Sequence, residues 1–196
     1  MNVIRIDLPL DLEQIEIHSF ADEHIGDSLS SVERLKERID YVERTPNAYC
    51  ILNGDLMDNA TRMSVGDTYT QVFNPMAQLE KAVELFGGIK DKILCVTDGN
   101  HENRTYRTEG IKLSKLIAVQ LGITELYSPE AACIFLRLGH DSKHEVDRRI
   151  AYTLYVTHGS VGGRKEGAKA IRLADMANII DTDIYVMGHT HLPMTM

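Results

Sequence analysis

Short apolar runs alternate with longer amphipathic segments along the chain, which predicts strands and helices that follow one another in turn. The apolar runs are of strand length and are rich in Ile, Val, Leu and Tyr, residues that favour extended structure. Most of them lead into Gly, Asp, Asn or His, so each strand is expected to end in a polar turn. The predicted strands occupy residues 15–21, 48–52, 92–97, 132–138, 149–157 and 183–187.

Between these runs, apolar residues recur three and four positions apart, as they do on one face of a helix. Ser30 and Glu33 predict a capping box at the start of one such segment. Asn74 as N-cap and Pro75 at the first helical position predict the start of another. The predicted helices span residues 30–45, 74–88, 166–180 and a segment near 108–121.

This alternation predicts an α/β fold. The runs 132–138 and 149–157 flank a polar stretch and are expected to form a hairpin with a long turn. With 196 residues and no repeat, linker or low-complexity tract, the chain is expected to fold as a single domain spanning residues 1–196.

Composition narrows the class of protein. The chain is 43% hydrophobic and 26% charged, as expected of a globular protein, and no apolar run has the length of a membrane span. Cys50, Cys95 and Cys133 lie in strand-like runs without metal-ligand spacing, which predicts buried, reduced thiols in a cytoplasmic protein. A net charge of −8 argues against broad nucleic-acid binding, although it leaves room for a local basic patch.

Candidate chemistry is concentrated where the predicted strands end. Ligands of α/β proteins bind beyond the carboxyl ends of strands, and five strand ends in this chain deliver His, Asp or Asn. Each cluster alone is typical of a turn, but five of them together favour a shared site. The residues are Asp22, His24, Asp55, Asp58, Asn100, His101, His158, His189 and His191.

The types of these residues indicate metal binding. Asp, Asn and His are the mixed oxygen and nitrogen ligands of Mn²⁺, Fe, Zn²⁺ or Ni²⁺. No thiolate accompanies them, which argues against a structural zinc site. Seven of these nine residues, all except Asp58 and His101, are candidate ligands; they are too many for one ion and suit two, an arrangement that supports phosphoryl chemistry.

The spacing of these residues resembles the motifs of the calcineurin-like metallophosphoesterase superfamily, and the chain resembles its stand-alone phage and bacterial members. The superfamily pattern is D-x-H, G-D-x-x-D/N, G-N-H-E/D, H-G and G-H-x-H, in that order. The chain carries all five motifs across residues 22–191, as Asp22-Glu23-His24, Gly54-Asp55-Leu56-Met57-Asp58, Gly99-Asn100-His101-Glu102, His158-Gly159 and Gly188-His189-Thr190-His191.

The resemblance implies a four-layer αββα sandwich. Two departures stand out: Ala21 replaces the Ser that usually precedes the first motif, and only residues 192–196 follow the last one. The usual C-terminal strands are therefore expected to be missing from the domain, which would leave the second sheet incomplete. A shortened chain, a naturally short protein and strands supplied by a partner chain all stay open as reasons.

The resemblance also implies how the ligands divide between two divalent ions. Asp55 is expected to bridge the ions, of which manganese is favoured and Fe, Zn or Ni stay open. The first ion is expected to be held by Asp22, His24 and His191 with Asp55, and the second by Asn100, His158 and His189 with Asp55.

A hydroxide that bridges the ions is expected to attack phosphorus in line. His101 is expected to face the leaving oxygen, and Asp58 to hydrogen-bond and orient His101. Arg104, Arg164 and Lys165 are candidates for binding the substrate phosphate, with a surface salt bridge or a solvated helix start as the alternative.

Two neighbouring features are assigned less directly. Glu102 is expected to support its own loop, and residues 59–73 form either a lid over the ions or plain surface. The expected function is hydrolysis of a phosphate mono- or diester, with a small ester or a nucleotide as substrate. A manganese-dependent DNA nuclease of the same superfamily and a non-catalytic scaffold that keeps the fold are the alternatives. The protein is expected in the cytoplasm, or in the host cytoplasm if phage-encoded, and its oligomeric state stays open.

Overall fold

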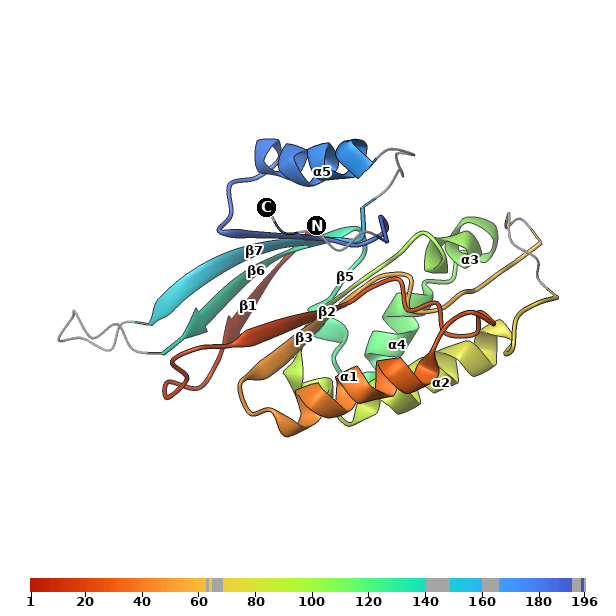
Figure 1. The fold of residues 1–196 in the computed structure, drawn as a ribbon, viewed down its shortest axis with the longest axis horizontal. Helices are drawn as coiled ribbons and strands as arrows, with labels where there is room; N and C mark the ends of the chain where they lie inside the picture. The colour runs from red at the N-terminus through yellow and green to blue at the C-terminus, as the bar shows by residue number, and fades with distance from the viewer. Residues whose placement is uncertain (63, 65–68, 140–148, 160–165, 192–194, 196) are drawn as a thin grey trace.

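The fold is of the α/β class and contains two facing sheets with helices on their outer sides (Figure 1). No helix in the described part of the chain is long and apolar enough to cross a membrane. The computed structural model describes residues 1–62, 64, 69–139, 149–159, 166–191 and 195.

One sheet is entirely parallel and contains four strands in the order β2-β3-β4-β5. Every residue of β3 and β4 is buried, which explains why both segments are apolar on both faces. The helices α1, α2 and α4 lie along the outer face of this sheet (Figure 1). The strands are β2 (Glu16–Phe20), β3 (Ala48–Asn53), β4 (Ile93–Thr97) and β5 (Tyr127–Ser128), and the helices are α1 (Val32–Arg44), α2 (Pro75–Gly87) and α4 (Leu113–Leu121).

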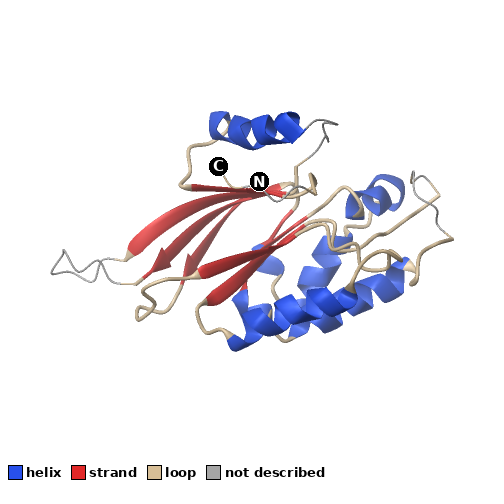
Figure 2. Cartoon of the chain, viewed as in Figure 1, coloured by secondary structure: helices blue, strands red, loops and turns tan. Residues whose placement is uncertain are grey.

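The other sheet is mixed and has the order β1-β6-β7-β8. Strands β6 and β7 are antiparallel and form the predicted hairpin, whereas the outer pairs β1-β6 and β7-β8 are parallel. Helix α5 covers the outer face of this sheet (Figure 2). The bounds are β1 (Asn2–Asp7), β6 (Ala131–Leu138), β7 (Ile150–Thr157), β8 (Ile184–Met187) and α5 (Glu166–Asp175).

Three apolar clusters hold these layers together. The largest lies between the parallel sheet and its helices, where Phe20 and Phe86 pack edge to face at 5.3 Å. The second fills the space between the two sheets and includes Ile51 and Ile134. A smaller third cluster around Met176 joins α5 to the mixed sheet. Burial of apolar surface thus explains the order of the layers, in which the two sheets face each other and the helices pack on their outer sides.

All six predicted strands are present, but two further strands were not predicted. Strand β1 lies at the edge of the mixed sheet and shows only one buried residue, Ile4, so its sequence lacks a continuous apolar run. Strand β5 has two residues, too few for a periodic pattern. The three cysteines are buried and none forms a disulfide.

Two predicted helix boundaries are wrong. Ser31 caps α1 by accepting a hydrogen bond from the Arg34 amide, whereas the predicted cap Ser30 donates to the Glu23 carbonyl. The single helix predicted near 108–121 is two helices, α3 (Glu102–Glu109) and α4, because Gly110 takes a left-handed conformation that ends α3.

Candidate metal centre

The ends of five strands, three from the parallel sheet and two from the mixed sheet, meet on one side of the molecule. The loop after β2 is bonded to the loop after β3, since the Asp22 amide donates to the Gly54 carbonyl at 3.2 Å. The sheets are joined there by Asn53, whose side-chain amide donates to the Thr157 carbonyl at 3.0 Å. In two triads, Asp22 with His24 and His191, and Asp55 with His158 and His189, the ligand atoms lie within 4.8 Å of one another.

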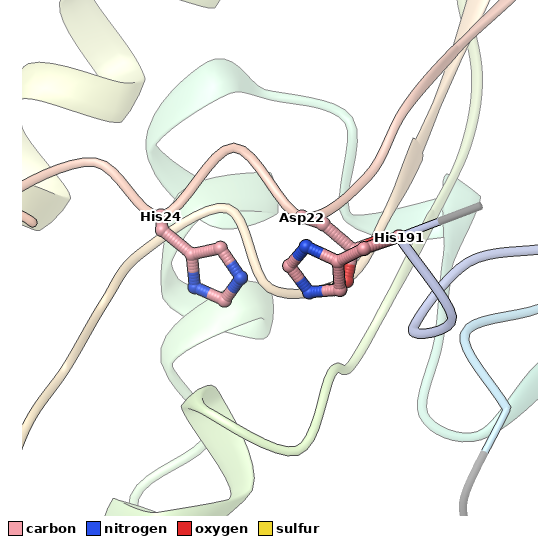
Figure 3. Close-up of side chains that lie close together, drawn as sticks. All are labelled: Asp22, His24 and His191. Carbon is pink, nitrogen blue, oxygen red and sulfur yellow. The ribbon is translucent and has the colours of Figure 1, made fainter. Parts of the chain in front are cut away.

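The first triad joins the loop after β2 to the loop after β8. Nε2 of His191 lies 3.3 Å from Oδ1 of Asp22, and the rings of His24 and His191 are stacked with centroids 5.3 Å apart. Figure 3 shows the two imidazoles side by side, with the Asp22 carboxylate next to His191. The other oxygen of Asp22 accepts a hydrogen bond from the His189 amide at 2.9 Å, so Asp22 also holds the loop that carries both histidines.

The second triad is centred on the buried ring of His158. Its Nε2 lies 3.1 Å from Oδ2 of Asp55 and 3.2 Å from Oδ1 of Asn100. Its Nδ1 contacts the Asn53 carbonyl at 2.7 Å. That carbonyl accepts a hydrogen bond from Nδ1 and leaves Nε2 directed at the carboxylate and amide oxygens, the arrangement of a metal-ligating histidine. The His189 ring lies edge-on to His158 at 5.3 Å.

These distances fit divalent ions. Two ligand atoms about 2.1 Å from one ion, at angles between 90° and 109°, lie about 3.0–3.4 Å apart. The contacts of Asp22 with His191, and of His158 with Asp55 and Asn100, fall between 3.1 and 3.3 Å. In addition, Oδ1 of Asp22 and Nδ1 of His24 are buried without a hydrogen-bond partner. A cation would satisfy lone pairs that otherwise lose their hydration without compensation.

The backbone at these residues is strained. Six described residues other than glycine have positive φ, and five of the six are candidate ligands. This conformation costs about 1–3 kcal/mol per residue and persists only where surrounding contacts impose it, most often at functional sites. The six are Asp22, His24, Asp55, Asn59, His189 and His191.

The charges of the second triad are coupled. Burial by itself would raise the pKa of Asp55, but the hydrogen bond and charge of His158 outweigh it and hold that pKa below the ordinary value. Burial by itself would lower the pKa of His158, but the hydrogen bond and charge of Asp55 outweigh it and raise that pKa. For His24 and His189, burial lowers the pKa, which favours the neutral form that binds metal.

His101 lies beside the first triad, with its ring centroid 4.3 Å from that of His24. Nδ1 of His101 contacts the Asp58 main-chain carbonyl at 2.6 Å, whereas the Asp58 carboxylate is 3.4 Å away. Asp58 therefore hydrogen-bonds His101 as expected, and the shorter contact comes from its main-chain carbonyl. His24, Asp58 and His101 also form a third cluster of possible ligand atoms, which shares His24 with the first triad.

Of the three residues predicted to bind the substrate phosphate, only Arg104 lies within the described part of the chain. The guanidinium of Arg104 donates to Nε2 of His101 at 2.8 Å and to the Asp58 carbonyl at 3.1 Å, so Arg104 lies at the site. Arg164 and Lys165 lie outside the described residues, as does part of the predicted lid 59–73. Lys169, which was not singled out, donates to the Thr190 carbonyl at 2.6 Å and ties α5 to the two-histidine loop.

Three buried polar residues that support the site were missed or only partly recognised from the sequence. Asn59 donates to the His101 carbonyl at 2.7 Å and to the Thr105 hydroxyl at 2.9 Å. Asn53 joins the two sheets and also accepts from the Thr97 hydroxyl at 2.9 Å. Glu102, predicted to support its own loop, also binds the loop after β3. A polar residue inside an otherwise apolar strand, such as Asn53, was the signal available in the sequence.

The Glu102 side chain is 1% exposed and lies against the candidate bridging residue. Its carboxylate accepts from the amides of Asp55 and Met57 at 2.9 Å and from that of Gly99 at 3.1 Å. Burial, followed by the charge of Asp55, raises the pKa of Glu102 to about 7. The amides of Met57 and Asp55 oppose this rise, since they stabilise the ionised form.

A scan of protein-family models, a search of curated proteins and a search of solved structures each find no match for this chain. The function proposed below therefore depends on the geometry of the described residues and on the resemblance of their motifs.

Proposed function

We propose that this chain is a phosphoesterase that depends on two divalent metal ions and belongs to the calcineurin-like type. The observation that carries the proposal is the pair of adjacent triads, one of Asp22, His24 and His191 and the other of Asp55, His158 and His189. Their ligand atoms have the spacing of metal ligands, and five of these six residues are held in a strained backbone conformation.

The residues present would hold two ions in the way that the motif resemblance implies. Asp22, His24 and His191 would hold one ion and His158, His189 and Asn100 the other. The carboxylate of Asp55 would lie between them. Bound divalent ions polarise a phosphoryl oxygen and lower the pKa of water, which supplies the nucleophile for ester hydrolysis.

His101 and Arg104 would act on the ester from the side of the first triad. Both ring nitrogens of His101 are engaged, Nδ1 with the Asp58 carbonyl and Nε2 with Arg104. A phosphate group that drew Arg104 into a bidentate contact would release Nε2, which would then take up a proton from solvent and donate it to the leaving oxygen. Asp58 and Asn59 would keep the ring in place through main-chain contacts.

The test is hydrolysis of p-nitrophenyl phosphate and bis-p-nitrophenyl phosphate with Mn²⁺, combined with a Mn²⁺ titration by calorimetry. We expect two equivalents of Mn²⁺ per chain and Mn²⁺-stimulated hydrolysis of at least one ester. Asp55→Asn should lower both metal affinity and activity at least about 100-fold, because it alters a residue that would bind both ions directly. Asp7→Asn, a surface carboxylate paired with Arg137, is the matched control and should change neither.

The same assays separate the alternatives. A scaffold would fail to bind two equivalents of Mn²⁺, and turnover no higher than that of Asp55→Asn with any divalent metal would refute the proposed activity. Cleavage of single-stranded or nicked DNA in preference to the small diester would favour a nuclease.

A further inference from the structure

A carboxylate joins the two loops that deliver the candidate bridging residue and its neighbours. Glu102 is the first residue of α3, and its side chain turns inward instead of facing solvent. One carboxylate oxygen accepts from the amides of Asp55 and Gly99, and the other accepts from the amide of Met57. Three main-chain donors from the loops after β3 and β4 thus converge on one side chain.

These loops have no room to adjust independently. A Cβ atom on Gly99 would lie 2.1 Å from both the amide nitrogen and Oδ1 of Asp55. Oδ1 of Asp55 accepts from the His101 amide at 2.8 Å, and Oδ2 faces His158. Asp55 lies beyond the last residue of β3 and has a φ of 50°, and its amide needs an acceptor, which Glu102 supplies.

We propose that Glu102 is a positioning residue for the metal centre: its carboxylate holds Asp55 in the left-handed conformation in which Oδ2 faces His158. Both Glu102 oxygens are occupied by main-chain amides, so the side chain takes no part as a ligand. This inference rests on the proposed function only for its effect on metal binding. The three hydrogen bonds themselves exist independently of any ion.

The geometry requires two acceptor oxygens. In Glu102→Gln the side chain keeps its shape but gains an NH₂ group, which donates and cannot accept. Whichever way the amide is turned, NH₂ faces at least one of the amides of Asp55, Met57 and Gly99, and that contact is lost. Glu102→Asp keeps both oxygens on a shorter side chain and should restore part of the function.

The experiment compares Glu102→Gln with Asp98→Asn as a matched control. Asp98 is also a buried carboxylate at the end of β4. Its partners are the Tyr127 hydroxyl and the Lys112 ammonium, whereas the amides of Asp55, Met57 and Gly99 donate to Glu102. We expect Glu102→Gln to weaken Mn²⁺ affinity about 10- to 100-fold, as found for residues that orient metal ligands. Glu102→Asp should lie between Glu102→Gln and the unsubstituted chain, and Asp98→Asn should bind Mn²⁺ normally.

Amide hydrogen exchange of the metal-free proteins gives a second measurement. The amides of Asp55, Met57 and Gly99 should exchange faster in Glu102→Gln, while amides in the centre of β6 keep their protection. Unchanged exchange at all three amides, or equal losses of Mn²⁺ affinity in Glu102→Gln and Asp98→Asn, would overturn the inference. If the unsubstituted chain binds no metal, the proposed function fails, but the exchange result still decides the role of Glu102.

Discussion

The guanidinium of Arg104 donates a hydrogen bond to Nε2 of His101 across 2.8 Å. Arginine has no acceptor atom, so Nε2 must carry a lone pair and Nδ1 must carry the proton that contacts the Asp58 carbonyl. The free protein therefore holds His101 as a neutral imidazole of defined tautomer. Burial and then the charge of Arg104 lower the pKa of His101, against the opposing charge of Asp55.

Replacing Arg104 should change the protonation of His101. In Arg104→Gln the positive charge disappears, so the pKa of His101 should rise and the imidazolium should persist to higher pH. A histidine titration of the metal-free protein by NMR measures this directly. With Mn²⁺ present, kcat/KM for the diester should fall about 10- to 100-fold, the range for groups next to a metal site.

Arg107→Gln is the control for this change, because Arg107 is exposed on the same helix. Its titration curve for His101 should match that of the unsubstituted chain. An unchanged His101 pKa in Arg104→Gln would show that the hydrogen bond does not form in solution.

Metal binding should depend on pH through His158. The pKa of His158 is raised in the metal-free protein, so an ion must displace a proton from Nε2. Affinity for Mn²⁺ should therefore fall as pH decreases below that raised pKa, by up to about tenfold per pH unit for one proton. Calorimetry in two buffers of different ionisation enthalpy counts the protons released, and zero release below pH 7 would contradict the prediction.

His158 and Asp55 should also make the stability of the metal-free protein depend on pH, in the direction opposite to that of metal affinity. His158 has a folded pKa above its ordinary 6.5, so its contribution to stability is complete below pH 6.5 and is lost as pH rises through the raised value. Asp55 has a folded pKa below its ordinary 3.8, so its contribution is lost only in strong acid. Urea unfolding with EDTA should show this decline above pH 6.5. His158→Gln should make the decline smaller, and the part that persists near pH 7 is due to the raised pKa of Glu102.

A side chain at Gly99 should disrupt the site sterically. A Cβ there meets the Asp55 amide and carboxylate, neither of which is free to move. Gly99→Ala should therefore lower the free energy of unfolding by about 1–3 kcal/mol, the usual cost of overpacking, and should also abolish Mn²⁺ binding.

Gly87→Ala serves as the comparison for Gly99→Ala. Gly87 ends α2, and a Cβ there meets no atom within 4 Å. This variant should be as stable as the unsubstituted chain or more stable by about 0.4–1 kcal/mol, since alanine restricts the unfolded chain. Equal stabilities of the two variants would argue against the close approach of the loops.

Asn53 should be essential for joining the sheets. Asn53→Ala leaves the Thr157 carbonyl and the Thr97 hydroxyl without their partner, which should cost about 1–3 kcal/mol of unfolding free energy. Asn178→Ala, at an exposed position after α5, should cost little. Denaturant unfolding of both variants checks the difference, and a cost for Asn53→Ala no larger than that for Asn178→Ala would contradict it.

The α/β class, six of the eight described strands and most helices could be predicted because local periodicity and capping residues carry that information. Asn74, for example, caps α2 as predicted by accepting from the Ala77 amide. Strands β1 and β5 were not predicted, since β1 has a single buried residue and β5 has only two residues, so neither carries a clear pattern. The start of α3 was missed because its first turn contains the polar residues of the site itself.

The sequence by itself also determined which residues are candidate ligands, because five polar clusters follow five strands. The motif resemblance implied that His189 and His191 lie in different triads, whereas the distances within each triad were set by the tertiary structure. Both residues have positive φ, so the simple alternation of an extended strand does not apply to them.

The contacts that support the site could not be predicted from the sequence, because they join residues that are far apart along the chain. Glu102 binds amides that are 45 and 47 positions away, and Asn53 bonds to a carbonyl 104 positions away. A hydrogen bond depends on the positions of two atoms in space, and for groups so distant along the chain those positions are set by the packing of the two sheets. The sequence determined the chemistry of the donors and acceptors, and the packing decided which of them meet.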